Sequence, residues 1–315
     1  MNDETSLIKI ENLCVTFPTE SGIVQASSDI NLSLEERESL CLVGESGCGK
    51  TVVALSTLNL LPSNARITGQ IWFKGDNILS LSDKEMQQRI RGRQISIIFE
   101  QPATCLNPVI KVGKQIAESI SINGSYSKKE VKETAIKLME MVGIASPNKR
   151  LEQYPHEFSG GMQQRVMIAM ALASRPSLLI ADEPTTSLDM TIQAQIMELL
   201  KNLTEKFNTS LFLITHDLGV AAQMCERVAV MYAGEIVETG KVVDVFQHPK
   251  HPYTQALIQV TKHINHKSAH GTVPELTNLP NGCRFHPRCP YAENICKNSR
   301  PPFIDDVRCH LWQKT

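Results

Sequence analysis

One glycine-rich segment constrains the fold of this chain more than any other feature. It fits the phosphate-binding pattern G-x-x-x-x-G-K-[ST] and consists of Gly44, Glu45, Ser46, Gly47, Cys48, Gly49, Lys50 and Thr51. An apolar run at 39–43 precedes it, and a helical pattern at 51–61, stopped by Pro62, follows it. In such a place the backbone N–H groups of the loop can converge on phosphate oxygens at a helix N-terminus. We therefore expect Lys50 to reach the β- and γ-phosphates of ATP and the Thr51 hydroxyl to ligate Mg²⁺.

A candidate for the other side of such a site follows a second predicted strand. The apolar run 178–181 is followed directly by Asp182 and Glu183. Because a P-loop site needs an acid at the end of another strand, we expect Asp182 to hold the magnesium ion. Glu183 would then polarise the attacking water. An acidic turn after a buried strand is otherwise ordinary, so this interpretation depends on the P-loop motif beside it.

The apolar pattern predicts an α/β fold with an additional β-subdomain. Residues 7–15 and 22–34 alternate apolar and polar side chains, which predicts an antiparallel β-subdomain near the N-terminus. Short apolar runs at 178–181, 211–214 and 228–231 are typical of parallel strands that are covered on both faces. The sequence thus indicates a nucleotide-binding α/β core.

A helical insertion interrupts this core. The stretch from about 83 to 175 has a mainly helical pattern, and its clearest helix begins at a capping box of Ser127 and Glu130 and ends at Gly143. We predict a helical subdomain at about 102–165. Past about residue 248 the composition changes to Pro, His, Asn and Cys, which marks a separate appendage. The predicted division is an ATPase domain over 1–260 and a C-terminal extension over 261–315.

Charge and hydropathy exclude several classes of protein. The 315 residues include 32 Lys and Arg and 33 Asp and Glu, for a net charge of −1. A chain this neutral has no overall basic surface for wrapping nucleic acid. Its apolar runs fall far short of the roughly 18 residues that a membrane span requires, and its start has no signal-peptide core. We expect a protein that is neither secreted nor inserted in a membrane by itself.

A second glycine pair identifies a family. The segment 158–165 reads Phe-Ser-Gly-Gly-Met-Gln-Gln-Arg and opens a predicted helix. With the P-loop, it resembles the nucleotide-binding subunits of ABC transporters. In that family the signature closes over ATP held by an opposing subunit, so that two domains enclose two nucleotides. The resemblance assigns the signature role to Ser159, Gly160, Gly161 and Gln163.

The same resemblance assigns roles to further single residues. Phe17 matches the aromatic residue that stacks on adenine, Asp189 matches the D-loop, and His216 matches the switch histidine that contacts the γ-phosphate. One position departs from the family pattern. The family has glutamine directly after the Phe that ends a strand, but here Glu100 follows and Gln101 comes next. Either a carboxylate oxygen of Glu100 ligates Mg²⁺ or Gln101 takes the Q-loop role through a local backbone shift.

Three motifs point to one branch of the family. They are Tyr-Pro-His-Glu-Phe at 154–158, His-Pro-Tyr-Thr at 251–254 and the Cys-containing segment 282–290. These resemble the ATPase subunits of dipeptide, oligopeptide and nickel importers, and the tail is most similar to the dipeptide-permease D-type subunit. The resemblance covers about 7–260 and continues into the tail.

Four of the nine cysteines are crowded near the C-terminus. They are Cys283, Cys289, Cys296 and Cys309. Without an export signal we expect a reducing compartment, which favours a metal site over disulfides. Four thiolates suit an iron–sulfur cluster or a structural zinc, and uncommitted thiols are the third reading. The lack of a tight Cys-x2-Cys pair disfavours zinc, and members of this branch with such a tail carry a [4Fe–4S] cluster.

The tail itself predicts a structural role for such a centre. It is short and has too little apolar material to close its own core, so binding energy from four thiolates would compensate. Since the cysteines lie beyond every ATP motif in the sequence, we expect their loss to leave nucleotide affinity nearly intact. Redox sensing is the alternative role.

The resemblance implies an ATPase that powers uptake of dipeptides or oligopeptides from the cytoplasmic face of the membrane. The implied partners are a second, homologous ATPase subunit in a heterodimer, two transmembrane permease subunits and an extracytoplasmic substrate-binding protein, with no nucleic acid. An importer of nickel or another small solute is the nearest alternative. A soluble non-transport ABC ATPase is disfavoured because the chain has one P-loop, no repeat and no sustained heptads. An iron–sulfur regulator that only binds ATP is disfavoured by Glu183 and the complete signature.

Overall fold

The structure is a computed structural model that describes residues 6–124, 126–186, 188–261 and 272–313. The chain forms two compact units, Met1–Ser80 with Leu213–Thr315 (the first unit) and Leu81–Phe212 (the second unit). The boundaries of these compact units are not the predicted domain boundary near residue 260. That domain boundary stays a prediction.

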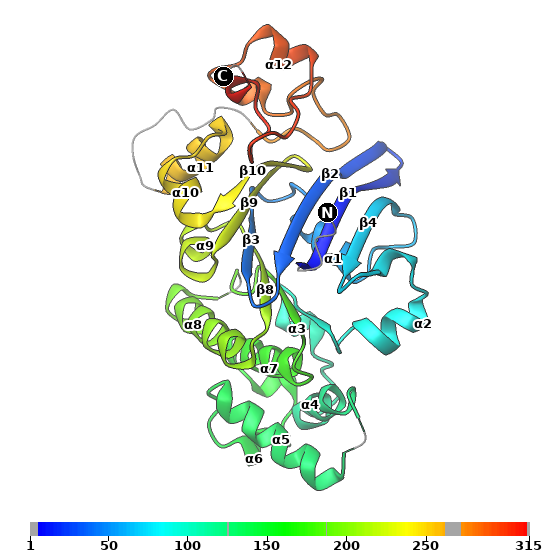
Figure 1. Cartoon of the computed structure of the whole chain (residues 1–315). Coiled ribbons are helices and arrows are strands. Elements are labelled where there is room, and N and C mark those ends of the chain that lie inside the picture. The colour runs from blue at the N-terminus through cyan, green and yellow to red at the C-terminus, as the bar shows by residue number, and fades with distance from the viewer. Residues whose placement is uncertain (1–5, 125, 187, 262–271, 314–315) are drawn as a thin grey trace. The chain divides into compact units, whose positions relative to one another are not determined.

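An antiparallel sheet opens the first unit (Figure 1). Its strands are β1 (Ser6–Thr19), β2 (Gly22–Glu35), β4 (Arg66–Phe73) and β5 (Asp76–Asn77), in the order β2-β1-β4-β5. Leu13 and Val15 of β1 are fully buried, whereas Asn12 is exposed, as alternation predicts. The predicted β-subdomain is therefore present, with β1 extending four residues beyond the predicted end.

The P-loop strand belongs to a second sheet of the first unit. Its strands in this unit are β10 (Glu235–Lys241), β9 (Arg227–Tyr232), β3 (Ser39–Val43) and β8 (Ser210–Thr215, where the chain returns from the second unit), in this order. β3 pairs with β9 in parallel, and β10, which the sequence analysis missed, pairs with β9 antiparallel. The helices of this unit are α1 (Lys50–Thr57), α9 (Leu218–Met224), α10 (Val242–Gln247), α11 (Pro252–Thr261) and the short α12 (Asn294–Asn298).

The helix after the P-loop is shorter than predicted. α1 ends at Thr57 rather than at residue 61. Asn59 adopts the left-handed conformation with φ of 49°, and its N–H bonds the Ser56 carbonyl while the N–H of Leu60 bonds the Leu55 carbonyl. This pair of bonds is a Schellman cap, which satisfies the last helical carbonyls and ends the helix before Pro62 is reached.

The second unit combines a parallel strand pair with helices. β6 (Ile95–Ile98) pairs in parallel with β7 (Leu178–Asp182). β6 lies inside the stretch with a mainly helical pattern and ends directly before Phe99, where the family pattern places the end of a strand. The helices are α2 (Asp83–Glu85), α3 (Pro102–Cys105), α4 (Val112–Ser121), α5 (Lys128–Met141), α6 (Pro147–Arg150), α7 (Gly160–Leu172) and α8 (Met190–Phe207).

Three local predictions in this unit are confirmed. Ser127 and Glu130 form the capping box of α5, with the Ser127 hydroxyl accepting from the Glu130 N–H at 3.2 Å. Gly143 follows the helix with φ of 74°, a conformation that glycine adopts without strain. In β7, residues 178–181 are fully buried, as expected for a strand covered on both faces.

The tail packs on the rest of the first unit. The Arg308 N–H donates to the Val237 carbonyl at 2.8 Å, and the Thr239 N–H donates to the Asp306 carbonyl at 2.9 Å. These bonds attach the tail to β10. A buried guanidinium adds to them, because Arg308 also pairs with Asp29 of β2 at 3.0 Å.

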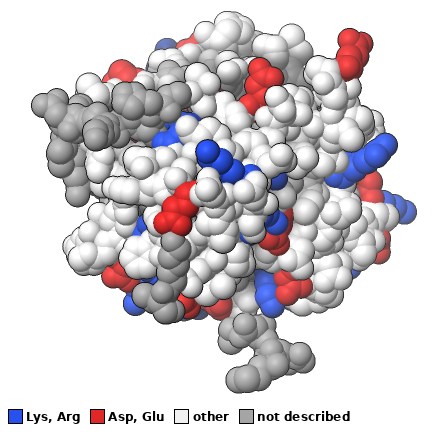
Figure 2. Space-filling model, turned by 90° about the horizontal axis from the view of Figure 1, so that it is seen from above, with Lys and Arg blue, Asp and Glu red and all other residues white. Residues whose placement is uncertain are grey.

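Among the described helices, none is long and apolar enough to cross a bilayer. On the face drawn in Figure 2, basic and acidic side chains are interspersed over a mostly uncharged surface. The described residues on this face show no extended patch of one sign, which agrees with the net charge of −1.

Candidate functional site

The P-loop has no room for side chains at two of its glycines. A Cβ on Gly44 would lie 2.2 Å from the Met231 carbonyl oxygen, and one on Gly49 would lie 2.1 Å from the Ala26 carbonyl oxygen. Gly49 also has φ of 104° and is the N-cap of α1. The loop is therefore held closely against β9 and β2, with the N-terminus of α1 directed at it, which is the geometry that binds phosphate.

Lys50 lies over this loop. Its ammonium group donates to the Gly44 carbonyl at 2.8 Å and to the Glu45 carbonyl at 3.1 Å, and the residue is 5% exposed. The next residue, Thr51, is exposed at the start of α1. Both side chains thus belong to the loop itself, as the motif predicts, and Thr51 is accessible to a ligand.

The first unit also contains two of the other predicted nucleotide residues. Phe17 is half-buried in β1, opposite Val24 of β2. His216 is exposed directly after β8. Asp217 caps the following helix α9 by accepting from the N–H groups of Gly219 at 2.7 Å and Val220 at 3.2 Å. This cap fixes the backbone next to His216 while leaving the imidazole exposed.

The predicted acids lie in the second unit at the end of β7. Asp182 is its last residue and is 4% exposed. Glu183 is more accessible and has φ of 45°, a conformation that is strained for a residue with a side chain. Its carboxylate accepts a hydrogen bond from the Thr186 hydroxyl at 2.9 Å. The two carboxylates are therefore adjacent in sequence but differ in burial.

The two Q-loop candidates follow β6 in the same unit. Glu100 and Gln101 are both exposed. Gln101 is the N-cap of α3, and its carbonyl accepts from the N–H of Thr104 at 3.2 Å and from the Thr104 hydroxyl at 2.8 Å. Its side chain makes no cap bond. Both side chains are thus accessible, and both stay candidates.

The signature segment begins a helix. Ser159 is the N-cap of α7 and accepts from the Met162 N–H at 3.4 Å. Ser159 and Gly160 are exposed. The Gln163 amide turns onto its own loop and donates to the Pro155 carbonyl at 2.9 Å. In the same unit, the exposed Asp189 caps α8 through the N–H groups of residues 191 and 192. The exposed Ser159 and the N–H groups of the first turn of α7 can bind an anion.

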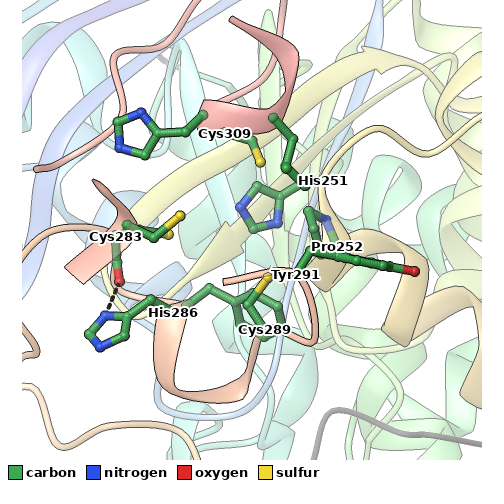
Figure 3. Close-up of a pocket in the computed structure, with 11 residues that line it drawn as sticks. His251, Pro252, Cys283, His286, Cys289, Tyr291 and Cys309 are labelled. Carbon is green, nitrogen blue, oxygen red and sulfur yellow. Dashed lines mark hydrogen bonds between the residues drawn. The ribbon is translucent and has the colours of Figure 1, made fainter. Parts of the chain in front are cut away.

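The four tail cysteines line one small cavity of the first unit (Figure 3). Cys283, Cys289, Cys296 and Cys309 contribute thiols, and the ring of His251 is among the other lining groups. The Cys283 N–H donates to the Cys296 carbonyl at 2.8 Å, which joins two segments of the tail. The pKa of the Cys283 thiol is raised to about 12, mainly because the thiol is buried. The other three cysteines raise this pKa further.

The groups that line this cavity are the candidate ligands of the predicted metal centre. Within the described ranges, no three His, Cys, Asp or Glu side chains lie close enough to hold a single metal ion. Yet four thiols surround the cavity, and the buried Nε2 of His251 has no hydrogen-bond partner in the described part of the chain. A four-iron cluster separates its cysteine ligands more widely than one tetrahedral zinc does. An iron–sulfur cluster and zinc are therefore both tested as proposals below.

Sequence reasoning missed two residues that reach the P-loop from the C-terminal part of the chain. The guanidinium of Arg288 forms an ion pair with Glu45 at 2.8 Å, and the Tyr253 hydroxyl accepts from the Glu45 N–H at 3.0 Å. Both belong to motifs that had served only to identify the branch. Arg288 lies between the predicted metal ligands Cys283 and Cys289. A cation at that position was the one feature of the sequence that could have suggested an ion pair there.

Comparisons with known proteins agree with this geometry. Residues 27–186 match the family model of the ABC transporter, and residues 237–296 match that of the oligopeptide/dipeptide transporter C-terminal region. The chain is 48% identical to the oligopeptide transport ATP-binding protein OppD of Salmonella typhimurium, over 94% of this chain and 89% of that protein. It is 47% identical to the dipeptide transport ATP-binding protein DppD of Bacillus subtilis, over 94% of this chain and 90% of that one.

A solved structure matches as well. The dimeric, post-hydrolysis ATP-binding cassette MJ0796, bound to ADP and phosphate, has a TM-score of 0.66 and 29% identity, over 75% of this chain and 98% of that one. The fold and the P-loop define an ABC-type ATPase. The chain belongs to the ABC transporter family, in the group of oligopeptide and dipeptide transport ATP-binding proteins.

Proposed function

We propose that the chain hydrolyses ATP to drive the import of oligopeptides or dipeptides by a membrane transporter. The observation that carries this proposal is the similarity at 48% identity, over 94% of the chain, to a protein named for oligopeptide transport. The complete set of ATP motifs supports turnover rather than binding alone. A nickel or small-solute importer is the nearest alternative, and a non-transport ABC ATPase is the more distant one.

The P-loop binds the triphosphate in this proposal. Its backbone N–H groups and the α1 N-terminus face the phosphates, and Lys50 exchanges its bonds to the loop carbonyls for phosphate oxygens. Phe17 stacks on the adenine. Thr51 and Asp182 would hold Mg²⁺, which would supply positive charge beside the phosphates. Glu100 or Gln101 completes the magnesium side.

Hydrolysis needs a positioned water and stabilisation of the γ-phosphate. Glu183 accepts a proton from the water that attacks the γ-phosphorus, and the bond to the bridging oxygen of ADP breaks. His216 donates a hydrogen bond to the γ-phosphate. Ser159, Gly160, Gly161 and Gln163, together with Asp189, act on the nucleotide of an opposing subunit.

A signature segment that acts on the nucleotide of another subunit requires partner subunits. We propose a heterodimer with a second homologous ATPase, two transmembrane permease subunits that form the pore, and an extracytoplasmic substrate-binding protein. The chain would act peripherally on the cytoplasmic face of the membrane. The absence of a membrane-spanning helix among the described residues is consistent with this arrangement.

We also propose that Cys283, Cys289, Cys296 and Cys309 hold a [4Fe–4S] cluster. The shared cavity and the unsatisfied Nε2 of His251 support this assignment. The group would supply four iron–thiolate bonds that cross-link the tail. Structural zinc is the alternative. Anaerobic purification with iron, sulfide and zinc analysis distinguishes them, and a broad absorption band at about 400 nm is expected for the cluster.

Copurification tests the transport assignment first. A tagged chain expressed with the other proteins of its transporter should copurify from detergent-solubilised membranes with two permease subunits. ATPase activity of that complex should rise with peptide and its binding protein. Nickel-dependent stimulation without a peptide effect would favour the alternative importer, and recovery of the chain without any membrane subunit would contradict a transport role.

A further inference from the structure

We propose that the C-terminal part of the chain positions the P-loop through Glu45, so that Arg288 and Tyr253 set its affinity for the nucleotide phosphates. The inference rests on the proposed nucleotide site. It assigns positioning roles, not catalytic ones, because neither residue belongs to the phosphate-binding motif.

The Arg288 contact is bidentate. Nη1 donates to Glu45 Oε2 at 2.8 Å and Nη2 donates to Glu45 Oε1 at 3.0 Å. The side chains are 9% and 31% exposed, respectively. Fork-to-carboxylate pairs of this kind are stronger and more directional than a simple ion pair.

The backbone of Glu45 is held at the same time. Its N–H donates to the Tyr253 hydroxyl at 3.0 Å, and Tyr253 is 1% exposed. Its carbonyl accepts from the Lys50 ammonium at 3.1 Å. Glu45 therefore connects the C-terminal part of the chain to the lysine that is proposed to bind the phosphates.

An aromatic cluster fixes the positions of both holding groups. Tyr232, Tyr253 and Phe285 are fully buried, with ring centroids 4.6 to 5.5 Å apart. The Arg288 guanidinium lies over Tyr232 at 5.6 Å and over Phe285 at 5.9 Å. Since a packed cluster cannot shift one ring without the others, Arg288 and Tyr253 are presented to Glu45 as a rigid pair.

The ion pair between Arg288 and Glu45 affects the charge near the phosphates. An unpaired carboxylate at the second position of the loop would repel the anionic phosphates. Arg288 neutralises that charge and keeps Glu45 turned toward the tail. Tyr253 fixes the loop backbone before the ligand arrives, which lowers the entropy cost of binding. Both effects favour tighter binding of ATP without changing the chemistry of hydrolysis.

Arg288→Lys tests the proposal in the full-length chain. Lysine keeps the charge but loses the fork, so the affinity for Mg-ATP in calorimetric titration should fall roughly tenfold, the lower end of the range for charge-assisted hydrogen bonds. Tyr253→Phe removes only the hydroxyl and should lower affinity in the same direction. In the assembled transporter, KM for ATP should rise while kcat is largely kept.

The matched control is Arg308→Lys. Arg308 is a buried tail guanidinium, at 5% side-chain exposure, that pairs with Asp29 and does not contact the loop. Arg308→Lys should keep the affinity for Mg-ATP within about twofold of the wild-type value. Adding Glu45→Gln to Arg288→Lys should cost less than the sum of the two changes, because Arg288 acts through Glu45.

Three results would overturn the inference while leaving the nucleotide site intact. They are equal affinity in the wild type and Arg288→Lys, equal losses in Arg288→Lys and Arg308→Lys, or full additivity in the double variant. A wild-type chain that binds no Mg-ATP would overturn the proposed function and this inference with it.

Discussion

Glu183 accepts a hydrogen bond from the Thr186 hydroxyl at 2.9 Å while its own backbone holds a φ of 45°. A left-handed conformation at a residue with a side chain costs on the order of 1 kcal/mol or more and is frequent at functional sites. In the proposed function, this backbone conformation directs the Glu183 carboxylate toward the attacking water. Its neighbour Asp182, in contrast, is regular strand and is buried.

The first prediction concerns Glu183 as the base. Glu183→Gln removes the proton acceptor but keeps the shape of the side chain and its acceptor for Thr186. ATP binding should be kept, and turnover by the assembled transporter should fall by at least about 10²-fold, as expected when a positioned base is lost. Glu198→Gln, an exposed change on α8, is the control. Near-wild-type turnover of Glu183→Gln would rule out its role as the base.

The second prediction concerns assembly. Because the signature is proposed to act on nucleotide held by the facing subunit, the purified chain alone should hydrolyse ATP poorly. Addition of the second ATPase subunit of the same transporter should raise the rate per chain, and Ser159→Arg in this chain should abolish that gain. Hydrolysis by the chain alone at high dilution, at the rate of the complex, would contradict the proposal.

The third prediction concerns the tail. Cys296→Ser should release the metal of anaerobically purified protein and increase proteolysis of the tail. The sequence alone led us to expect nearly intact nucleotide affinity. Since Arg288 lies between Cys283 and Cys289 and contacts Glu45, we now expect the affinity for Mg-ATP to fall in the same direction as in Arg288→Lys. Metal-free wild-type protein with four freely alkylated tail thiols would refute the metal site.

The fourth prediction concerns the cysteine of the P-loop. Cys48 is fully buried, and burial raises its pKa to about 11. Since the thiolate is the nucleophile, iodoacetamide at pH 8 should leave Cys48 unmodified while it labels the exposed Cys105. Peptide mass spectrometry measures both sites in one sample. Labelling of Cys48 in the folded chain as fast as Cys105 would contradict its burial.

Local features of the fold were readable from the sequence. The P-loop, the capping box at Ser127 and the helix opened by the segment 158–165 depend on residues close together in the chain, whose backbone demands are strict. The end of α1 was misplaced because Pro62 is the more conspicuous stop, although Asn59 ends the helix first. In such cases a competing local signal decides the boundary.

Long-range contacts were not readable in this way. Glu45 and Arg288 are 243 positions apart, and the chain between them contains no periodic pattern that would bring them together. Residues 235–241 likewise show no strict alternation, since β10 is largely buried on both sides through 238. Tertiary packing decides both features, and only a structure places them.

Peptide uptake by whole cells tests the central claim most directly. A strain lacking this chain should be supplied with the wild type or with Glu183→Gln, and uptake of labelled di-, tri- and pentapeptides and of nickel should be compared. We predict that the wild type restores uptake of at least one peptide class and that Glu183→Gln restores none. Restored nickel uptake without any peptide uptake, or peptide uptake that is independent of this chain, would contradict the account.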